Sequence, residues 1–301
     1  MSGRMTADRN TLLLGIAMTV VAGALLATMD AIGKHLAQQL PVLQVVWARY
    51  FFHALLVVFA LLLRHGGGFL RSNHPWLQGI RSTALICVTG LLYLALVHVP
   101  LADATAVMFF APVLVTVLSA VFLAERLTPV RVAAVLAGFA GVLLIVRPGF
   151  HSEWAMLLPL AGACMLTVYL LLTRALSGKD PSRVTLFYTT TVGAALLTLL
   201  LPLVWEVPAG GAVWLMFIMG GLGALGHFLI ISAFAIAPAS VLSPFLYSQI
   251  LAAMVLSVAA FGDPLTLPML AGTLLLVAGG LAVWWRESRP TPVSPGRRET
   301  E

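Results

Sequence analysis

Ten long apolar runs, separated by short stretches of charged and turn-forming residues, make up most of the chain. A helix that crosses a membrane needs about 20 mostly apolar residues, and each run is close to that length. The runs are continuous rather than alternating, which argues against a transmembrane β-barrel. The pattern therefore predicts an all-α membrane protein with ten transmembrane helices, at residues 12–32, 43–63, 77–97, 102–123, 131–147, 155–174, 184–204, 212–236, 240–261 and 268–285.

Composition agrees with this prediction. Of the 301 residues, 60% are hydrophobic and only 9% are charged, against about 25% charged residues in a typical soluble domain. This composition excludes a soluble enzyme, a disordered chain and a disulfide-stapled secreted domain, because the chain has too few polar residues for a surface in contact with water. The two cysteines, Cys87 and Cys164, both lie in apolar runs. A structural disulfide is therefore not expected, and no Cys/His spacing typical of a metal site is present.

The positions of lysine and arginine predict the orientation. If the N-terminus is cytoplasmic, 14 of the 17 basic residues lie on the cytoplasmic side, Lys34 and Arg147 lie on the periplasmic side, and Arg49 lies within the second helix. Such a bias is typical of membrane proteins, and it accounts for the net charge of +6 without nucleic-acid binding. Both termini are predicted to be cytoplasmic. Because arginine greatly outnumbers lysine, a GC-rich bacterium is indicated, and the expected location is its inner membrane.

The second half of the chain repeats features of the first at a shift of 138 residues. The matching positions are Pro100-Leu101-Ala102 with Pro238-Ala239-Ser240, Leu118-Ser119 with Leu256-Ser257, and Gly141 with Gly279. Each half has five helices, so the second copy must enter the membrane from the other side, as in the inverted repeats of secondary transporters. The predicted organisation is an N-terminal tail (1–11), a first repeat (12–147), a periplasmic linker (148–154), a second repeat (155–285) and a disordered tail (286–301).

Several motifs resemble those of one transporter family. They are the corner Glu125-Arg126-Leu127-Thr128, its echo Asp263-Pro264-Leu265-Thr266, the glycines Gly138 and Gly141, and the intramembrane residues Asp30, Lys34 and Arg49. With them the sequence resembles the EamA family of the drug/metabolite transporter superfamily. The resemblance implies two five-helix halves around a central cavity, walled by helices 1, 3, 4, 6, 8 and 9. It leaves the cargo open, because relatives carry amino acids, riboflavin, S-adenosylmethionine, sugars or opine-type metal chelators.

Charged side chains inside a membrane are functional candidates by default. Asp30 lies near the outer end of the first helix, and Arg49 lies in the outer half of the second, with His53 one turn further on the same face. Two interpretations stay open. The pair either opens so that Arg49 holds a substrate carboxylate, or it is a permanent ion pair that locks the two helices. Lys34, in contrast, is expected to extend its amine to the outer interface.

A histidine near the middle of the eighth helix is the most informative single residue. His227 follows four glycines, and a histidine at this depth can exchange a proton near neutral pH. It is a candidate for proton coupling and substrate binding, or alternatively a neutral histidine bonded to a carbonyl across a helix interface. Further substrate-binding candidates are aromatic and amide side chains on helices expected to face the cavity: Tyr93, Phe109, Tyr169, Tyr247 and Gln249.

Motifs for catalysis or nucleotide binding are absent from the sequence, so neither enzyme activity nor a cofactor is predicted. The expected function is secondary active transport of a small polar metabolite, with protons as the candidate coupling ion and membrane lipid as the surroundings. Export of an amino-acid-like compound, either an amino acid or an opine-type metallophore, is favoured, because its charges would match Arg49 and Asp30. The alternatives are uptake of riboflavin or S-adenosylmethionine, a passive channel, and a membrane-embedded enzyme that uses His227 with Ser232 or Ser243.

Overall fold

The computed structural model describes residues 9–65, 68–123, 128–147, 154–176 and 178–287, and the regular elements within these ranges are all helices. Ten stretches of this described part are long and apolar enough to cross a membrane, which confirms the prediction from the apolar runs. The corner at residues 125–127, most of the linker and most of both tails lie outside the described residues.

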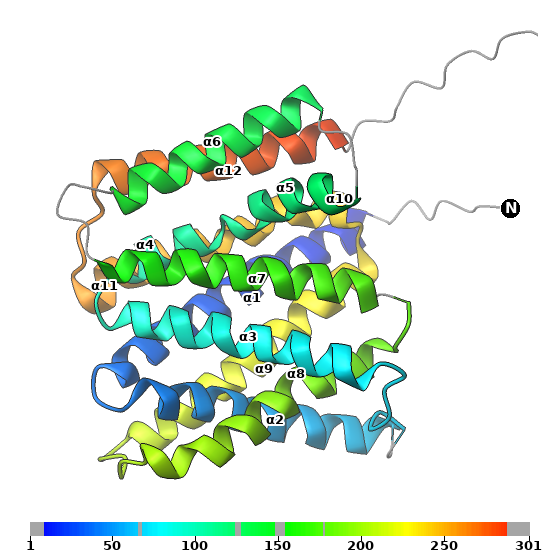
Figure 1. Cartoon of the computed structure of the whole chain (residues 1–301), viewed down its shortest axis with the longest axis vertical. Helices are drawn as coiled ribbons and strands as arrows, with labels where there is room; N and C mark the ends of the chain where they lie inside the picture. The colour runs from blue at the N-terminus through cyan, green and yellow to red at the C-terminus, as the bar shows by residue number, and fades with distance from the viewer. Residues whose placement is uncertain (1–8, 66–67, 124–127, 148–153, 177, 288–301) are drawn as a thin grey trace, which may run out of the picture.

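Successive membrane-spanning helices run in opposite directions through one bundle (Figure 1). The first half contains α1 (Arg9–Ala37), α2 (Val42–His65), α3 (Pro75–Leu96), α4 (Leu101–Met108), α5 (Ala111–Leu123) and α6 (Pro129–Val146). The second half contains η1 (Trp154–Met156), α7 (Leu157–Leu176), α8 (Ser182–Leu200), η2 (Leu201–Leu203), α9 (Ala212–Ile236), α10 (Ala239–Leu242), η3 (Ser243–Tyr247), α11 (Ser248–Phe261) and α12 (Leu267–Glu287).

Helices of the two halves interleave rather than forming two separate blocks. In the core, α1 packs against α9, α3 packs against α7, and α2 packs against both α8 and α9. At one side of the bundle, α6 and α12 lie next to each other, and in this view α5 and α10 follow below them (Figure 1). Because α1, α2, α3 and α9 also contact one another, polar side chains from four helices can meet inside the bundle.

Two of the ten spans are interrupted along their length. In the fourth span, α4 ends at Met108 and α5 begins at Ala111, directly before Pro112, which has no backbone N–H to continue the helical bonding. In the ninth span, the 3₁₀ turn η3 lies between α10 and α11. The two interruptions meet, since the rings of Phe109 and Tyr247 lie 5.5 Å apart between centroids.

Small residues let α6 and α12 approach at two points. A Cβ atom at Gly141 would lie 2.6 Å from the carbonyl oxygen of Gly272, and one at Gly279 would lie 3.1 Å from that of Ala134. The backbones are therefore too close for larger side chains, which is a common way to pack helices in membranes. The 138-residue shift found in the sequence relates Gly141 to Gly279 and Ala134 to Gly272. The two contacts are therefore equivalent positions of the two halves.

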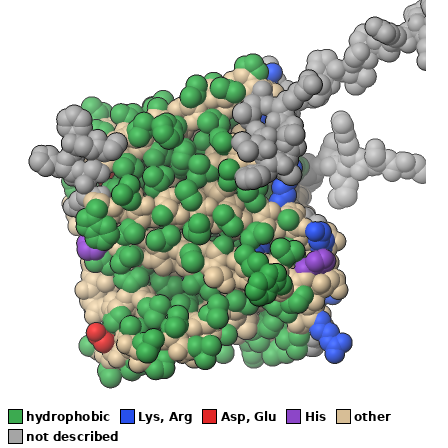
Figure 2. Space-filling view, viewed as in Figure 1, with side chains coloured by type: hydrophobic (Ala, Val, Ile, Leu, Met, Phe, Trp, Pro, Cys, Tyr) green, Lys and Arg blue, Asp and Glu red, His purple; other side chains and the backbone are tan. Residues whose placement is uncertain are grey.

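Basic side chains gather at one end of the bundle, on the right in Figure 2. We call this end the basic end, and its exposed residues are Arg9, Arg64, Arg71, Arg174, Lys179, Arg183 and Arg286. The end at which α1 finishes and α2 begins is called the opposite end. Between the two ends, hydrophobic side chains cover the face seen in Figure 2, as a surface in contact with lipid tails requires.

Candidate functional site

A polar cluster lies between α1, α2 and α3 in the half of the bundle nearer the opposite end. Nη1 of Arg49 donates to Oδ1 of Asp30 and to the hydroxyl of Tyr93, in both cases at 3.3 Å. The guanidinium also lies 5.5 Å from the centroid of the Tyr93 ring. Asp30 is 4% exposed and Tyr93 is fully buried. The structure thus brings together three of the predicted site residues, and the predicted contact between Asp30 and Arg49 exists.

Two histidines extend this cluster by one helical turn toward the middle of the membrane. The ring of His53, one turn after Arg49 on α2, lies 5.4 Å from the ring of His227 on α9. His53 is 5% exposed, and its Nε2 atom has no hydrogen-bond partner. Gly220 allows α9 to approach α2, because a Cβ atom there would lie 3.0 Å from the backbone nitrogen of His53. A Cβ atom at Gly223 would lie 3.0 Å from Sδ of Met29 on α1.

The other predicted site residues lie apart from this cluster. Tyr169 stands on α7 beside Arg81, and Phe109 and Tyr247 line a separate cavity. Gln249 lies in α11, where its backbone packs against Gly23 of α1. The nine candidates therefore fall in several places along the bundle rather than in a single pocket.

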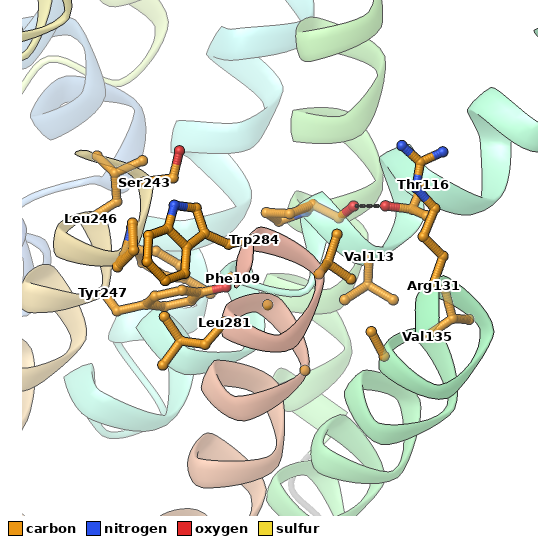
Figure 3. A pocket seen from close by; sticks show the side chains of 16 residues that line it. Phe109, Val113, Thr116, Arg131, Val135, Ser243, Leu246, Tyr247, Leu281 and Trp284 are labelled. Carbon is orange, nitrogen blue, oxygen red and sulfur yellow. Dashed lines mark hydrogen bonds between the residues drawn. The ribbon is translucent and has the colours of Figure 1, made fainter. Parts of the chain in front are cut away.

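The cavity lies between α5, α6, η3 and α12 and has a volume of about 540 Å³. Figure 3 shows Phe109, Tyr247 and Trp284 grouped at one side of it and Arg131 at the other. Gly280 leaves room for the Tyr247 hydroxyl beside the backbone of α12. Aromatic walls and a volume of roughly 300–1,000 Å³ suit a small organic ligand.

Lys34 does not extend to an interface, and that prediction was wrong. Its side chain is buried, and Nζ donates to Oδ2 of Asp263 at 2.9 Å and to the carbonyl of Val99 at 3.2 Å. The hydroxyl of Ser257 donates to the same carboxylate oxygen at 2.7 Å. This ion pair joins α1 to the loop after α11. α1 itself continues to Ala37, beyond the predicted end at residue 32.

Arg81 is a candidate that the sequence pattern did not single out. It was counted among the cytoplasmic arginines, but it lies within α3, six residues after the first residue of that helix, and is 1% exposed. Its guanidinium lies 4.8 Å from the centroid of the Tyr169 ring and donates to the hydroxyl of Thr189 at 2.9 and 2.5 Å. A stripe of polar residues along α3 was the available signal: Gln78, Arg81, Ser82, Thr89 and Tyr93.

Asp180 ties the loops of the two halves together at the basic end. Its carboxylate accepts hydrogen bonds from the Ser72 hydroxyl at 2.5 Å, the Asn73 backbone at 2.8 Å and the Gln78 amide at 3.0 Å. Desolvation alone would raise the pKa of this carboxyl. The hydrogen bonds from Ser72, Gln78 and Asn73 outweigh that effect, so the pKa of Asp180 lies below its ordinary value.

Comparison with known proteins shows that the chain is similar to transporters of small molecules. Residues 13–147 match the sequence profile of the EamA-like transporter family. An S-adenosylmethionine uptake transporter of Rickettsia felis is 23% identical, with 93% of this chain and 95% of that protein covered. A riboflavin transporter of Rhizobium johnstonii is 28% identical over 77% and 78% of the two chains. The pseudopaline exporter CntI of Pseudomonas aeruginosa is 29% identical over 73% and 78%.

The first half of the chain is thus similar to the EamA-like transporter family, and transporters resemble it over most of its length. A solved crystal structure resembles the fold with a TM-score of 0.63 and 24% sequence identity. The match covers 93% of the present chain and 99% of the chain in that crystal structure. This EamA-like chain is therefore a multi-pass membrane protein and a small-molecule transporter. The resemblance to this family that the sequence indicated is confirmed by the matched segment and by these relatives.

Proposed function

We propose that this EamA-like transporter is a secondary active carrier of a small metabolite that bears both a carboxylate and a cationic group. The Asp30–Arg49 pair carries this proposal, because it offers one group of each sign inside the membrane at a junction of helices from both halves. A cargo carboxylate would replace Asp30 on the guanidinium of Arg49, with two parallel hydrogen bonds in place of one. The released Asp30 would then bind the cationic group of the cargo. Only ion-pair partners are exchanged in this step, and no covalent bond is made or broken.

Export of an amino-acid-like compound, an amino acid or an opine-type metallophore, is the direction and cargo that we favour. The similarity to a pseudopaline exporter supports export. The similarity to S-adenosylmethionine uptake transporters supports the opposite direction equally well, and that cargo also carries a carboxylate and cationic groups. Riboflavin has no such pair of charges, so the Asp30–Arg49 pair does not favour it.

We also propose that the two halves are inverted copies that rock against each other. The exchange of the Gly141–Gly272 and Ala134–Gly279 contacts under the 138-residue shift supports this arrangement, and so does the meeting of the two interrupted spans at Phe109. The basic end, by its excess of arginine, is then the cytoplasmic end of a bacterial inner-membrane protein. α1 begins and α12 ends at that end.

His227 is the proposed proton-coupling residue. It faces His53, which is one turn from Arg49, so a proton on this pair would repel the Arg49 guanidinium and favour its release from Asp30. Arg49 in turn contacts the titratable groups of Asp30 on α1 and Tyr93 on α3. Replacing His227 by Gln should flatten the dependence of transport on pH, whereas His35→Gln, at an exposed position of α1, should not. An unchanged pH profile in His227→Gln would refute proton coupling there.

Untargeted metabolite profiling of cells and medium tests the function itself, with a deletion strain, its parent and a complemented strain. A zwitterionic compound that accumulates in deletion cells and disappears from their medium would establish export. A compound that stays in the medium and is depleted inside the cells would establish uptake and refute export. A cargo without a carboxylate would refute the role of Arg49. Arg49→Ala should give the deletion profile although the protein still inserts in the membrane, and Arg64→Ala, exposed at the end of α2, should give the parental profile.

A further inference from the structure

Arg81 is a buried cation without an acidic partner in the part of the chain that the structure describes. Within those ranges, the pairs that bring a basic nitrogen within 4.0 Å of a carboxylate oxygen are Arg49 with Asp30 and Lys34 with Asp263. The guanidinium of Arg81 contacts only neutral groups. Its Nε atom has no hydrogen-bond partner, although the side chain is 1% exposed.

The neutral groups around Arg81 are arranged to accept hydrogen bonds from its guanidinium. The hydroxyl of Thr189 donates its own proton to the carbonyl of Thr185 at 2.6 Å and so turns its lone pairs toward both terminal nitrogens of Arg81. The same carbonyl lies 3.5 Å from Nη2. Such dipoles replace only part of the hydration that a guanidinium loses inside a membrane. A carboxylate, which matches the fork of a guanidinium, is the partner that this position lacks.

A polar stripe of α3 connects Arg81 with the Asp30–Arg49 cluster. Thr89 and Tyr93 follow Arg81 by eight and twelve residues. At about 3.6 residues per turn, each step of four residues turns the helix by about 40°, so these polar residues wind slowly around α3, and Tyr93 lies about 120° from Arg81. Thr89 contacts the hydroxyl of Tyr50 at 3.2 Å, and Tyr93 accepts a hydrogen bond from Arg49. Arg81 and Tyr93 are twelve residues apart, which is about 18 Å along a helix. The guanidinium of Arg81 thus lies near one end of α3, and that of Arg49, on α2, contacts α3 near its other end.

We propose that Arg81, with Tyr169 beside it, is a second carboxylate-binding site of the transport path. Arg49 holds the carboxylate of the cargo in the half nearer the opposite end, and Arg81 holds it in the half nearer the basic end. The ring centroid of Tyr169 lies 4.8 Å from the guanidinium, and this cation–π contact helps to hold the fork of Arg81 in place. This inference rests on the proposed function, because only the carrier of an anionic group needs a second cation at the other end of its path.

A purely structural role for Arg81 would give a different set of results. If Arg81 only locks α3 to α8, then Arg81→Met should lower the stability of the protein, and transport should fall in proportion. If Arg81 instead binds the carboxylate of the cargo, Arg81→Met removes an uncompensated buried charge. The stability of the protein should then stay equal or rise, while transport is lost. Arg81→Lys, which keeps the charge without the fork, should retain an intermediate level of transport.

Ligand binding to the purified full-length protein tests the site directly. The probes are two pairs that differ by one carboxylate: L-histidine with L-histidinamide, and S-adenosylmethionine with its decarboxylated form. For the pair that the wild type binds, Arg81→Gln should weaken binding of the acid about 10- to 100-fold and change binding of its partner less than about 2-fold. Arg64→Gln should change neither. Equal affinity of wild type and Arg81→Gln for the acid would overturn the proposal.

Chemical labelling tests the site without any knowledge of the cargo. p-Hydroxyphenylglyoxal, which reacts with arginine, is added to right-side-out and inverted vesicles, and the modified residues are identified by peptide mass spectrometry. A residue of the transport path must become accessible, so Arg81 should react from the same side as Arg64 and at least about 10-fold less from the other side. If Arg64 reacts and Arg81 reacts from neither side, the site is permanently closed and the proposal fails. This result is separate from the proposed function, which stands or falls on metabolite profiling.

Discussion

Removing one member of the Asp30–Arg49 pair should destabilise the transporter more than removing both. The variants are Asp30→Asn, Arg49→Met and the double variant, in which the guanidinium is replaced by an apolar side chain of similar length. In the wild type the two side chains are 6% and 15% exposed and the ion pair spans 3.3 Å. Water therefore cannot hydrate either charge once its partner is lost.

The magnitude follows from this burial. Loss of one partner from a buried ion pair costs about 3–5 kcal/mol, because the other charge stays uncompensated, whereas an exposed pair contributes only about 0–1 kcal/mol. Replacement of both charges by neutral groups is often close to neutral. Each single variant should therefore lose at least about 3 kcal/mol of unfolding free energy, and the double variant should lie within about 1 kcal/mol of the wild type.

Unfolding by SDS in mixed micelles, followed by tryptophan fluorescence, measures these free energies. Arg64→Met, at an exposed position of α2, is the matched control and should change the unfolding free energy by less than about 0.5 kcal/mol. Single variants that lose less than about 1 kcal/mol, or effects that simply add in the double variant, would refute the argument from burial. Transport by the double variant decides between the two interpretations of the pair. A stable but inactive protein indicates that the pair binds cargo, and an active one indicates a structural lock.

Three further predictions concern other parts of the bundle. Gly141→Val should lower the unfolding free energy by about 1–3 kcal/mol, since its side chain would meet a carbonyl of α12. Gly90→Val, whose Cβ meets nothing within 4 Å, should be nearly neutral. Lys34→Gln should also destabilise, and the added change Asp263→Asn should restore part of the loss in the same titration. The lowered pKa of Asp180 means that it stabilises the fold above pH 4, roughly the pKa of an unfolded aspartate. This contribution disappears as the pH falls through the lower, native pKa, so between pH 6 and 3 wild type should lose more stability than Asp180→Asn in urea titrations.

The sequence was sufficient for the helices and for one polar contact. A helix satisfies its own backbone hydrogen bonds, so the length and apolar character of each run decide whether it can cross a membrane, and all ten runs are helical in the structure. Asp30 and Arg49 were expected to meet because two intramembrane charges on consecutive helices, at a similar depth, have few other partners. Among the four glycines before His227, Gly220 and Gly223 are points where α9 packs closely against α2 and α1.

Tertiary structure decided which side chains meet across long stretches of sequence. Lys34 pairs with Asp263, 229 residues away, and no local pattern distinguishes such a lysine from one that reaches the interface. Arg81 lies in the first turns of a helix, where a basic residue normally marks the membrane boundary, and only the packing of α3 against α7 and α8 shows that it is buried. Hydropathy fixes the depth of a residue in the membrane. The direction it faces depends on contacts between helices, so the sequence by itself determined the ten spans, and the three-dimensional packing decided how their polar groups are paired.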